Sequence, residues 1–281
     1  MPIQPDELDA VRDLVTIAGR HGMEIVLIGA AARLILIDWK GGGPVLRSTT
    51  DWDFGVRVGT WDDLRILHDR LCAGRDSPFS RTREEYRVRH RSGVSVDLVP
   101  FGALQRDDGT VRWPQTGAEM TVLGLDEAHA AAFPQRLADD LEVPTVTVPG
   151  LILLKLVAFG DRHAERDLGD GLHAIDFQAR QNEERVFDEF EPESLDYTSA
   201  PYVLVGRDCA ALCREPTWRR VAAVLGELNA PGFLFPGGLL GARFDADELD
   251  RRRAESVAKL RAFEAGFLDA APTASTSRTP P

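Results

Sequence analysis

The clearest structural signal in this 281-residue sequence is the segment Arg47-Ser48-Thr49-Thr50-Asp51-Trp52-Asp53-Phe54-Gly55-Val56. The segment from Phe54 to Val58 predicts a strand, and side chains two positions apart on a strand share a face. Asp51 and Asp53 therefore direct both carboxylates to one side, while Trp52 points into the core. Carboxylates whose Cα atoms are roughly 6–7 Å apart repel each other unless a cation lies between them. Mg²⁺ accepts one or two carboxylates together with substrate phosphates, so the pair predicts a site for Mg²⁺, or for Mn²⁺, and a nucleoside triphosphate (NTP).

A glycine turn lies upstream of these aspartates. Glu24 to Ile28 predicts a short strand, Gly29 breaks it, and Ala30 to Asp38 predicts a helix. Free backbone N–H groups at the start of a helix can hold phosphate oxygens, which makes Gly29 and Ala30 candidate nucleotide-binding residues. Many α/β proteins place a glycine at such a turn for steric reasons alone. Together with the Asp-x-Asp of the next strand, the turn favours nucleotide binding.

Asp97 is a third acidic candidate. It lies in Val94-Ser95-Val96-Asp97-Leu98-Val99, which is apolar on both faces and is predicted to be a central strand. An isolated ionised carboxylate in such a strand is costly unless it is paired, hydrogen-bonded or bound to metal. One interpretation is an ion pair with an arginine such as Arg87 or Arg89. The other is a third metal-site carboxylate that also deprotonates an attacking hydroxyl.

The composition restricts the class of protein. The net charge of −12 argues against broad, non-specific binding of nucleic acid, although a local basic groove is compatible with it. No apolar run approaches the roughly 18 residues of a membrane span, so no membrane partner is expected. Three cysteines give no disulfide framework, and Cys209 and Cys213 are interpreted as small core residues. We therefore expect a cytoplasmic protein.

The order of predicted elements indicates an α/β core followed by a helical region. A tight Ser92-Gly93 turn joins the last pair of strands in the core, which gives a mixed sheet with flanking helices. The predicted strands are 24–28, 53–58, 86–90 and 94–99, with 120–123 and 143–148 as edge strands. The predicted helices of the core are 6–21, 30–38 and 61–72. From Pro149 onward, the predicted helices are 151–159, 167–179, 200–214, 217–228 and 245–268.

At these residues the chain resembles the nucleotidyltransferase superfamily. Its members share a Gly-Gly or Gly-Ser turn, an Asp-x-Asp on the next strand and a third acidic residue on a nearby strand. Its AbiEii/AbiGii (MenT-like) toxin branch adds helical motifs, namely K-L-x-A, a following Asp/Arg, and R/K-D-x-x-D. These motifs are similar to Leu153-Leu154-Lys155-Leu156-Val157-Ala158-Phe159 and Asp161-Arg162-His163-Ala164-Glu165-Arg166-Asp167-Leu168-Gly169-Asp170. Arg47 matches the arginine that the branch carries ahead of Asp-x-Asp, and the resemblance covers roughly residues 20 to 180.

The resemblance implies a division of the chain and a reaction. Residues 1–148 would form a nucleotidyltransferase-fold catalytic core, and residues 149–270 a helical domain that completes the active-site cleft. Residues 271–281 are rich in Pro, Thr and Ser and are predicted to be a disordered tail. The reaction would move a nucleoside monophosphate from an NTP to an acceptor hydroxyl and release pyrophosphate. Positioning and neutralisation of phosphate charge would supply most of the catalysis.

By residue matching, the resemblance assigns roles to both parts of the chain. The metal ligands would be Asp51, Asp53 and Asp97. The nucleotide-binding positions of the core would be Gly29, Ala30, Arg47 and Thr50. Lys155 would contact phosphate. The side of the active-site cleft that faces the metal ligands would be lined by Arg162, Arg166, Asp167 and Asp170. One departure is Ala30, where many relatives have a serine, so a hydroxyl that could bind phosphate is absent.

Lys155 and the two aspartates also have non-catalytic interpretations. Lys155 would contact phosphate as a point charge, or it is a lysine that extends from an apolar helix to water. Asp167 and Asp170 lie three residues apart, on one helix face. One of them would serve as a base or as a partner of the lysine. The alternative is a solvated helix start, where carboxylates are favourable.

Several acceptors remain open. The toxin branch implies an RNA 3′ end, such as that of tRNA, and a neighbouring antitoxin protein. Arg251-Arg252-Arg253 would then contact RNA phosphates, or it is a solvated helix face. The acidic run from Asp188 to Glu193 would suit a cationic small molecule such as an aminoglycoside, or it is an exposed acidic linker. A protein hydroxyl is a further acceptor. The non-enzymatic interpretation is a degenerate nucleotide-binding module that keeps the fold.

Overall fold

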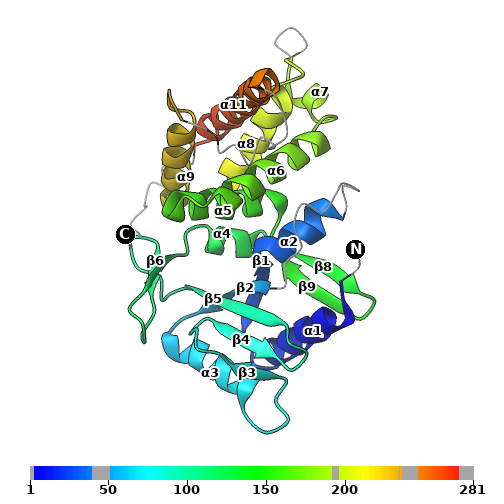
Figure 1. The fold of residues 1–281 in the computed structure, drawn as a ribbon, viewed down its shortest axis with the longest axis vertical. Coiled ribbons are helices and arrows are strands. Elements are labelled where there is room, and N and C mark those ends of the chain that lie inside the picture. The colour runs from blue at the N-terminus through cyan, green and yellow to red at the C-terminus, as the bar shows by residue number, and fades with distance from the viewer. Residues whose placement is uncertain (1–2, 40–50, 192–195, 234, 236–245, 272–281) are drawn as a thin grey trace, which may run out of the picture. The chain divides into compact units, whose positions relative to one another are not determined.

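The structure is a computed structural model that describes residues 3–39, 51–191, 196–233, 235 and 246–271. The chain divides into two compact units, Met1–Leu151 and Ile152–Pro281, and each is described by itself (Figure 1). The sequence predicts a boundary between residues 148 and 149. Arg47, Thr50, the end of the acidic run at residues 192 and 193, and the predicted tail beyond residue 271 lie outside the described residues.

A seven-stranded sheet forms the centre of the first unit, in the order β3-β4-β5-β2-β1-β9-β8 (Figure 1). β2 pairs antiparallel with β1 and parallel with β5, and β9 is parallel to β1. The predicted mixed sheet is therefore confirmed, and β5, the strand of Asp97, lies inside it as predicted. The strands are β1 (Glu24–Ile28), β2 (Asp51–Val58), β3 (Phe79–Arg81), β4 (Arg87–His90), β5 (Ser95–Gly102), β8 (Phe133–Ala138) and β9 (Leu141–Thr145).

Amphipathic helices flank this sheet. α1 (Pro5–Arg20) contacts β1 and α3 (Trp61–Cys72), and α3 contacts β2 and β3. α3 begins at a capping box in which the Thr60 hydroxyl accepts the backbone N–H of Asp63, so the predicted start at residue 61 has a local cause. α4 (Leu125–Ala130) contacts β5. The apolar stripe of α1 is buried and consists of Ala10, Val11, Leu14 and Ala18.

The predicted helix at 30–38 has two parts. α2 (Gly29–Arg33) continues into a π-helical turn, η1 (Leu34–Asp38), which the sequence pattern does not predict. Arg33 and Asp38 form an ion pair across this turn, with 2.9 Å between Nη1 and Oδ2. Both side chains are buried, so each charge is compensated inside the unit rather than by water.

Two edge-strand predictions are wrong. Residues 120–123 do not extend the main sheet, because β7 (Glu119–Thr121) pairs with β6 (Thr110–Arg112) in a separate two-stranded sheet. Residues 143–148 do not form an edge, because β9 lies between β1 and β8. β8 has the sequence Phe-Pro-Gln-Arg-Leu-Ala, which contains a proline and lacks the regular apolar alternation from which a strand is predicted.

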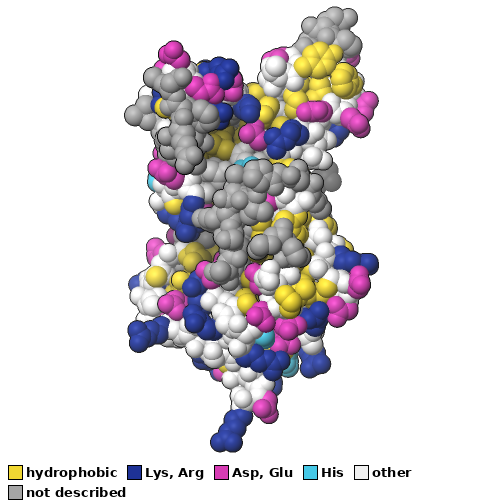
Figure 2. Space-filling view, turned by 45° about the vertical axis from the view of Figure 1, so that its right-hand side comes forward, with side chains coloured by type: hydrophobic (Ala, Val, Ile, Leu, Met, Phe, Trp, Pro, Cys, Tyr) yellow, Lys and Arg dark blue, Asp and Glu magenta, His cyan; other side chains and the backbone are white. Residues whose placement is uncertain are grey.

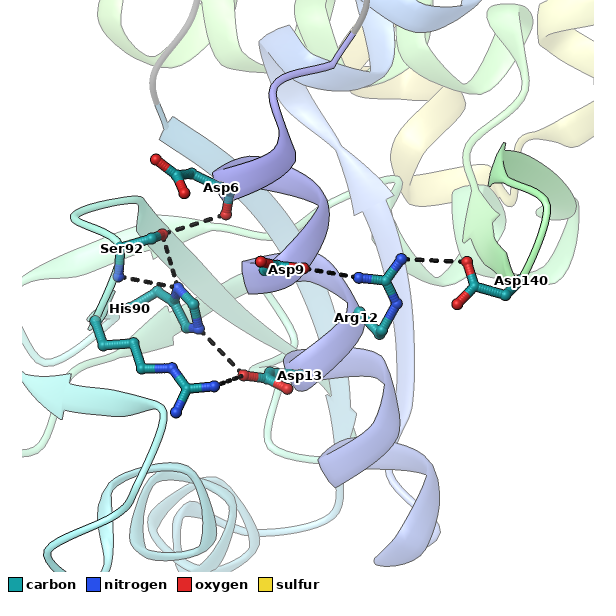
Figure 3. Close-up of polar contacts among 8 residues, drawn as sticks. Asp6, Asp9, Arg12, Asp13, His90, Ser92 and Asp140 are labelled. Carbon is teal, nitrogen blue, oxygen red and sulfur yellow. Dashed lines mark hydrogen bonds and ion pairs between the residues drawn. The ribbon is translucent and has the colours of Figure 1, made fainter.

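His90 ties α1 to the turn between β4 and β5 (Figure 3). The ring is buried, and its Nε2 lies 3.1 Å from Oδ2 of Asp13 on α1. Its Nδ1 lies 2.7 Å from the Ser92 hydroxyl and accepts the Ser92 backbone N–H at 3.2 Å. Because Nδ1 accepts, the neutral ring carries its proton on Nε2 and donates it to the Asp13 carboxylate.

The other side of α1 is tied to the far edge of the sheet (Figure 3). Arg12 donates from Nη1 to Asp9 at 2.9 Å and from Nη2 to Asp140 at 3.2 Å. Asp140 lies between β8 and β9. α1 therefore links the turn between β4 and β5 to the turn between β8 and β9, on either side of β1 and β2 in the sheet order.

The second unit is built from helices, which confirms the predicted helical C-terminal region. Its described helices are α5 (Val148–Arg162, which begins in the first unit), α6 (Glu165–Gln181), α7 (Val186–Glu189), α8 (Ala200–Leu212), α9 (Glu215–Leu228) and α11 (Ala246–Asp269). α8 and α11 cross in backbone contact. A Cβ added at Gly206 would lie 2.1 Å from the Phe263 carbonyl oxygen, and one added at Gly266 would lie 2.0 Å from that of Val203. Glycine at both positions permits this crossing.

The three cysteines are free thiols. Cys209 and Cys213 are buried, as predicted for core residues, and burial raises the pKa of the Cys209 thiol well above its usual value. Among the described helices, none has the length and apolar character needed to cross a membrane.

Candidate functional site

The two aspartates of the Asp-x-Asp stretch share one face of β2, as predicted. β2 begins at Asp51, two residues before the predicted start at Asp53. Trp52 is buried, whereas Asp51 and Asp53 are both partly exposed. The alternation means that Trp52 anchors the strand in the core and sends both carboxylates to the opposite side.

Gly29 brings the turn after β1 against Asp53. Ile28, the last residue of β1, is the register partner of Asp53. Gly29 follows with a φ of 70°, and a Cβ added there would lie 2.1 Å from Oδ2 of Asp53. Only glycine combines this backbone conformation with such a close carboxylate. The turn and the aspartate, which the sequence proposes as one site, are therefore adjacent, and Ala30 next to them is buried.

A row of charges crosses the sheet at this level. Arg87 on β4 is the register partner of Asp97 on β5, and Asp97 is the register partner of Asp53 on β2. Register partners on neighbouring strands present their side chains on the same face. Arg87, Asp97 and Asp53 therefore lie side by side on the face that also carries Asp51.

Arg87 forms hydrogen bonds with two of the three carboxylates. Its Nε and Nη2 donate to Oδ1 and Oδ2 of Asp97 at 2.6 and 2.8 Å, a two-bond fork. Nη2 also lies 3.4 Å from Oδ2 of Asp51. The hydrogen bonds to Asp97 raise the pKa of Arg87, with the charges of Asp97 and Asp51 adding to the effect. Of the two arginines considered as partners of Asp97, Arg87 occupies this position, and Arg89 is exposed opposite Ser95.

Asp51 and Asp53 fit a divalent ion better than Asp97 does. The pair shares a face next to a turn that only glycine can form, and Mg²⁺ needs no more than one or two carboxylates when phosphate oxygens complete its shell. Asp97 already gives both oxygens to Arg87. Within the part of the chain that the structure describes, no three His, Cys, Asp or Glu side chains are arranged to hold a metal ion by themselves.

A second charge cluster lies in the second unit, between α5 and α6. The Lys155 ammonium lies 2.7 Å from Oδ2 of Asp170 and 3.4 Å from Oδ1 of Asp167. Lys155 and Asp167 are both buried, and the Asp170 side chain is 13% exposed. Both aspartates therefore contact the lysine.

Arg162 completes this cluster, and Arg166 does not join it. Arg162 donates from Nε to Oδ2 of Asp167 at 2.5 Å. Burial acts to raise the pKa of Asp167, but the Arg162 hydrogen bond and the Lys155 charge outweigh it, so the pKa is lowered. Arg166 is exposed, and no ion pair of the described residues includes it. The two arginines, assigned to one side of the cleft by the resemblance, thus have different surroundings.

The arginine run on α11 pairs with acids of its own helix. Arg252 donates to Glu248 at 2.8 Å, and Arg253 to Asp250 at 2.9 Å. Arg251 also pairs with Glu248. This is the arrangement of a solvated helix face, one of the two interpretations considered. Figure 2 likewise shows Lys and Arg side chains mixed with Asp and Glu over the coloured part of the face drawn.

The residue that sequence reasoning underrated is Arg87. The sequence presents it only as an alternative partner of Asp97, although it touches Asp51 as well. The sequence does carry a local signal for the pairing of Arg87 with Asp97. The hairpin turn closes with the His90 N–H donating to the Val94 carbonyl, and counting back from that pair sets Arg87 opposite Asp97.

The chain has distant structural likenesses. No protein-family model matches it, and no curated protein matches it in sequence. Similar solved structures include the solution structure of the antibiotic-resistance factor ANT(2'')-Ia, with 13% identity, a TM-score of 0.35 and coverage of 79% of this chain and 92% of that one. Another is a tRNA-processing enzyme in an apo form, with 11% identity, a TM-score of 0.25 and coverage of 95% of this chain and 79% of that one. At such TM-scores the likeness carries no conclusion about activity.

Proposed function

We propose that this protein is a divalent-ion-dependent nucleotidyltransferase, which moves a nucleoside monophosphate from an NTP to an acceptor hydroxyl. The observation that supports it most is the contact between the Gly29 turn and the Asp53 carboxylate, with Asp51 on the same face. A turn that only glycine can form beside two strand carboxylates suits polyphosphate and its cation.

In this proposal the residues of the first unit bind and orient the triphosphate. Asp51 and Asp53 would hold Mg²⁺ or Mn²⁺, which when bound supplies neutralisation of phosphate charge. The backbone N–H groups at the start of α2, after Gly29, would hold phosphate oxygens. In the second unit, Lys155 and Arg162 are the proposed phosphate contacts. Lys155 has three donors and uses two on aspartates.

The proposed reaction forms one bond and breaks one. The acceptor oxygen bonds to the α-phosphorus, the bond from that phosphorus to the bridging oxygen breaks, and pyrophosphate leaves with those electrons. The hydroxyl proton is released. Following the motif resemblance, we propose an RNA 3′ end as the acceptor and an antitoxin protein as a binding partner. The acidic charge balance favours a cationic small molecule as the second candidate acceptor.

The test is a transfer screen with four α-labelled NTPs, in Mg²⁺ and in Mn²⁺. Total RNA, a protein lysate and an aminoglycoside mixture are offered separately as acceptors. Label in RNA supports the proposal in full, and label in protein or in the small molecule supports the chemistry while replacing the acceptor. The absence of label with every NTP, ion and acceptor contradicts the proposed activity.

A further inference from the structure

The charge row on the sheet contains its own cation. Arg87 binds Asp97 through two hydrogen bonds and reaches Asp51 with the same Nη2 that serves Asp97. We propose that Arg87 is a positioning residue that neutralises Asp97 and orients Asp51, so that Asp51 and Asp53 hold the divalent ion without Asp97. This inference rests on the proposed function and specifies which carboxylates the ion uses.

The register of the sheet determines which residues meet in this arrangement. Arg87 is placed opposite Asp97 by the β4–β5 ladder, and Asp97 is placed opposite Asp53 by the β2–β5 ladder. β5 is an interior strand with hydrogen-bonded neighbours on both sides. Two strand pairings therefore set the backbone positions of Arg87, Asp97 and Asp53, and the two hydrogen bonds to Asp97 hold the guanidinium.

Burial makes the Arg87–Asp97 pair hard to separate. The Asp97 side chain is 12% exposed and that of Arg87 is 26% exposed. If Asp97 turned to a metal ion, the guanidinium would lose its fork and be left poorly solvated, which is strongly unfavourable. The Asp51 side chain is 44% exposed and its contact with Arg87 is 3.4 Å long, so this contact does not prevent Asp51 from reaching an ion at its exposed part.

The Arg87–Asp97 pair adds no net charge next to the proposed ion, because one guanidinium faces one carboxylate. The guanidinium stays protonated at any working pH. Arg87 thus takes the place that a third ligand interaction or a second ion would otherwise fill.

The experiment titrates Mn²⁺ into the full chain and follows free Mn²⁺ by electron paramagnetic resonance, with and without a non-hydrolysable NTP analogue. The decisive variant is the double substitution Arg87→Gln with Asp97→Asn, which removes the pair without changing net charge. We expect Mn²⁺ affinity within about twofold of the wild type, because no ligand is lost. We also expect slower turnover at saturating NTP, because Asp51 is no longer oriented. Arg89→Gln, on the same strand and opposite Ser95, is the matched control and should change neither quantity.

Two further variants sharpen the result. Arg87→Gln alone should tighten Mn²⁺ binding severalfold, because Asp97 is then an unpaired carboxylate next to the ion. Asp53→Asn should weaken binding by about tenfold or more. If Arg87→Gln does not fold, the double variant still decides, because its pair is neutral.

The outcomes separate the two proposals. A double variant that loses about as much Mn²⁺ affinity as Asp53→Asn makes Asp97 a ligand, which overturns this inference and leaves the nucleotidyltransferase proposal standing. A wild-type chain that binds no Mn²⁺ with or without the NTP analogue overturns both. Unchanged Mn²⁺ affinity with unchanged turnover in the double variant also overturns the positioning role of Arg87.

Discussion

The two charge clusters use similar parts and differ in access. In each, one cation is shared by two aspartates, namely Arg87 by Asp97 and Asp51, and Lys155 by Asp170 and Asp167. The sheet cluster leaves Asp51 44% exposed, whereas the helix cluster buries Asp167 to 1% exposure. A carboxylate that water reaches can exchange water for a metal ion, and one that is buried between two cations stabilises the fold. The aspartates of the sheet cluster are therefore the ion-binding ones in our proposal. The aspartates of the helix cluster hold α5 to α6 and position Lys155 and Arg162, the proposed phosphate contacts.

The largest expected effect is on the sheet cluster. Asp53→Asn should lower nucleotidyl transfer by at least about 10²–10³-fold, because a neutral amide replaces a charged group that meets the ion. The thermal unfolding midpoint should move little, since Asp53 is only partly buried. Transfer is measured in the labelled-NTP assay. Asp76→Asn, an exposed aspartate of the same unit, is the control, and equal activity of the two variants would remove Asp53 from the site.

Stability should respond in the opposite order. Asp167→Ala leaves the buried Lys155 and the Arg162 donor without their shared partner, so we expect a loss of about 3–5 kcal/mol in the free energy of unfolding. Asp51→Ala changes a side chain that is 44% exposed and whose contact with Arg87 is 3.4 Å long, and should cost less than about 1 kcal/mol. Urea unfolding measures both. Similar losses in the two variants would mean that the clusters do not differ as their exposure indicates.

Acid should weaken the helix cluster through Asp167. The pKa of Asp167 is lowered in the folded state, so its contribution is complete above the unfolded value of about 3.9 and disappears as pH falls through the lower folded value. Urea titrations of the wild type and of Asp167→Asn between about pH 6 and pH 2 should show a stability difference that shrinks toward the acid end. A difference that stays constant over this range would show that Asp167 is not held ionised by its neighbours.

The close approach of Gly29 to Asp53 leads to a prediction about the turn after β1. Gly29→Ala meets both a positive φ and the Asp53 carboxylate, whereas Gly22→Ala meets a positive φ with nothing within 4 Å. We expect about 1 kcal/mol of destabilisation for Gly22→Ala from the backbone alone. Gly29→Ala should cost about 1–3 kcal/mol more, and should also impair NTP-dependent Mn²⁺ binding because Asp53 is displaced. Equal losses in the two variants would show that Asp53 does not need the space at Gly29.

Elements with local sequence signals are predicted correctly, and elements without them are not. β1 and α3 have the predicted bounds, because an apolar run and a capping box are local signals. The shared face of Asp51 and Asp53 follows from strand periodicity and needs no knowledge of the fold. β8 is missed because its sequence contains a proline and lacks the regular apolar alternation, and its pairing with β9 is what moves that strand away from the edge.

The pairings across the sheet separate what is local from what is not. The tight turn between β4 and β5 sets the register of Arg87 against Asp97, so that ion pair is encoded within a short segment. The contact of Arg87 with Asp51 spans 36 residues and depends on the parallel register of β2 with β5. No turn fixes that register, since parallel strands are joined by long crossovers. The double role of Arg87 therefore becomes visible only in three dimensions.

The smallest expected effects are stability changes at Arg162 and Arg166, the two arginines at the edge of the helix cluster. Arg162→Gln removes a hydrogen bond to the buried Asp167 carboxylate, and should cost about 1 kcal/mol in the free energy of unfolding. Arg166→Gln changes an exposed side chain outside the cluster, and should stay within about 0.5 kcal/mol of the wild type. If Arg166 contacts phosphate as the motif resemblance implies, this variant should raise the KM for NTP while leaving stability unchanged. A variant with unaltered KM and stability would exclude Arg166 from the site, and the functional content of the second unit would then rest on Lys155 and Arg162.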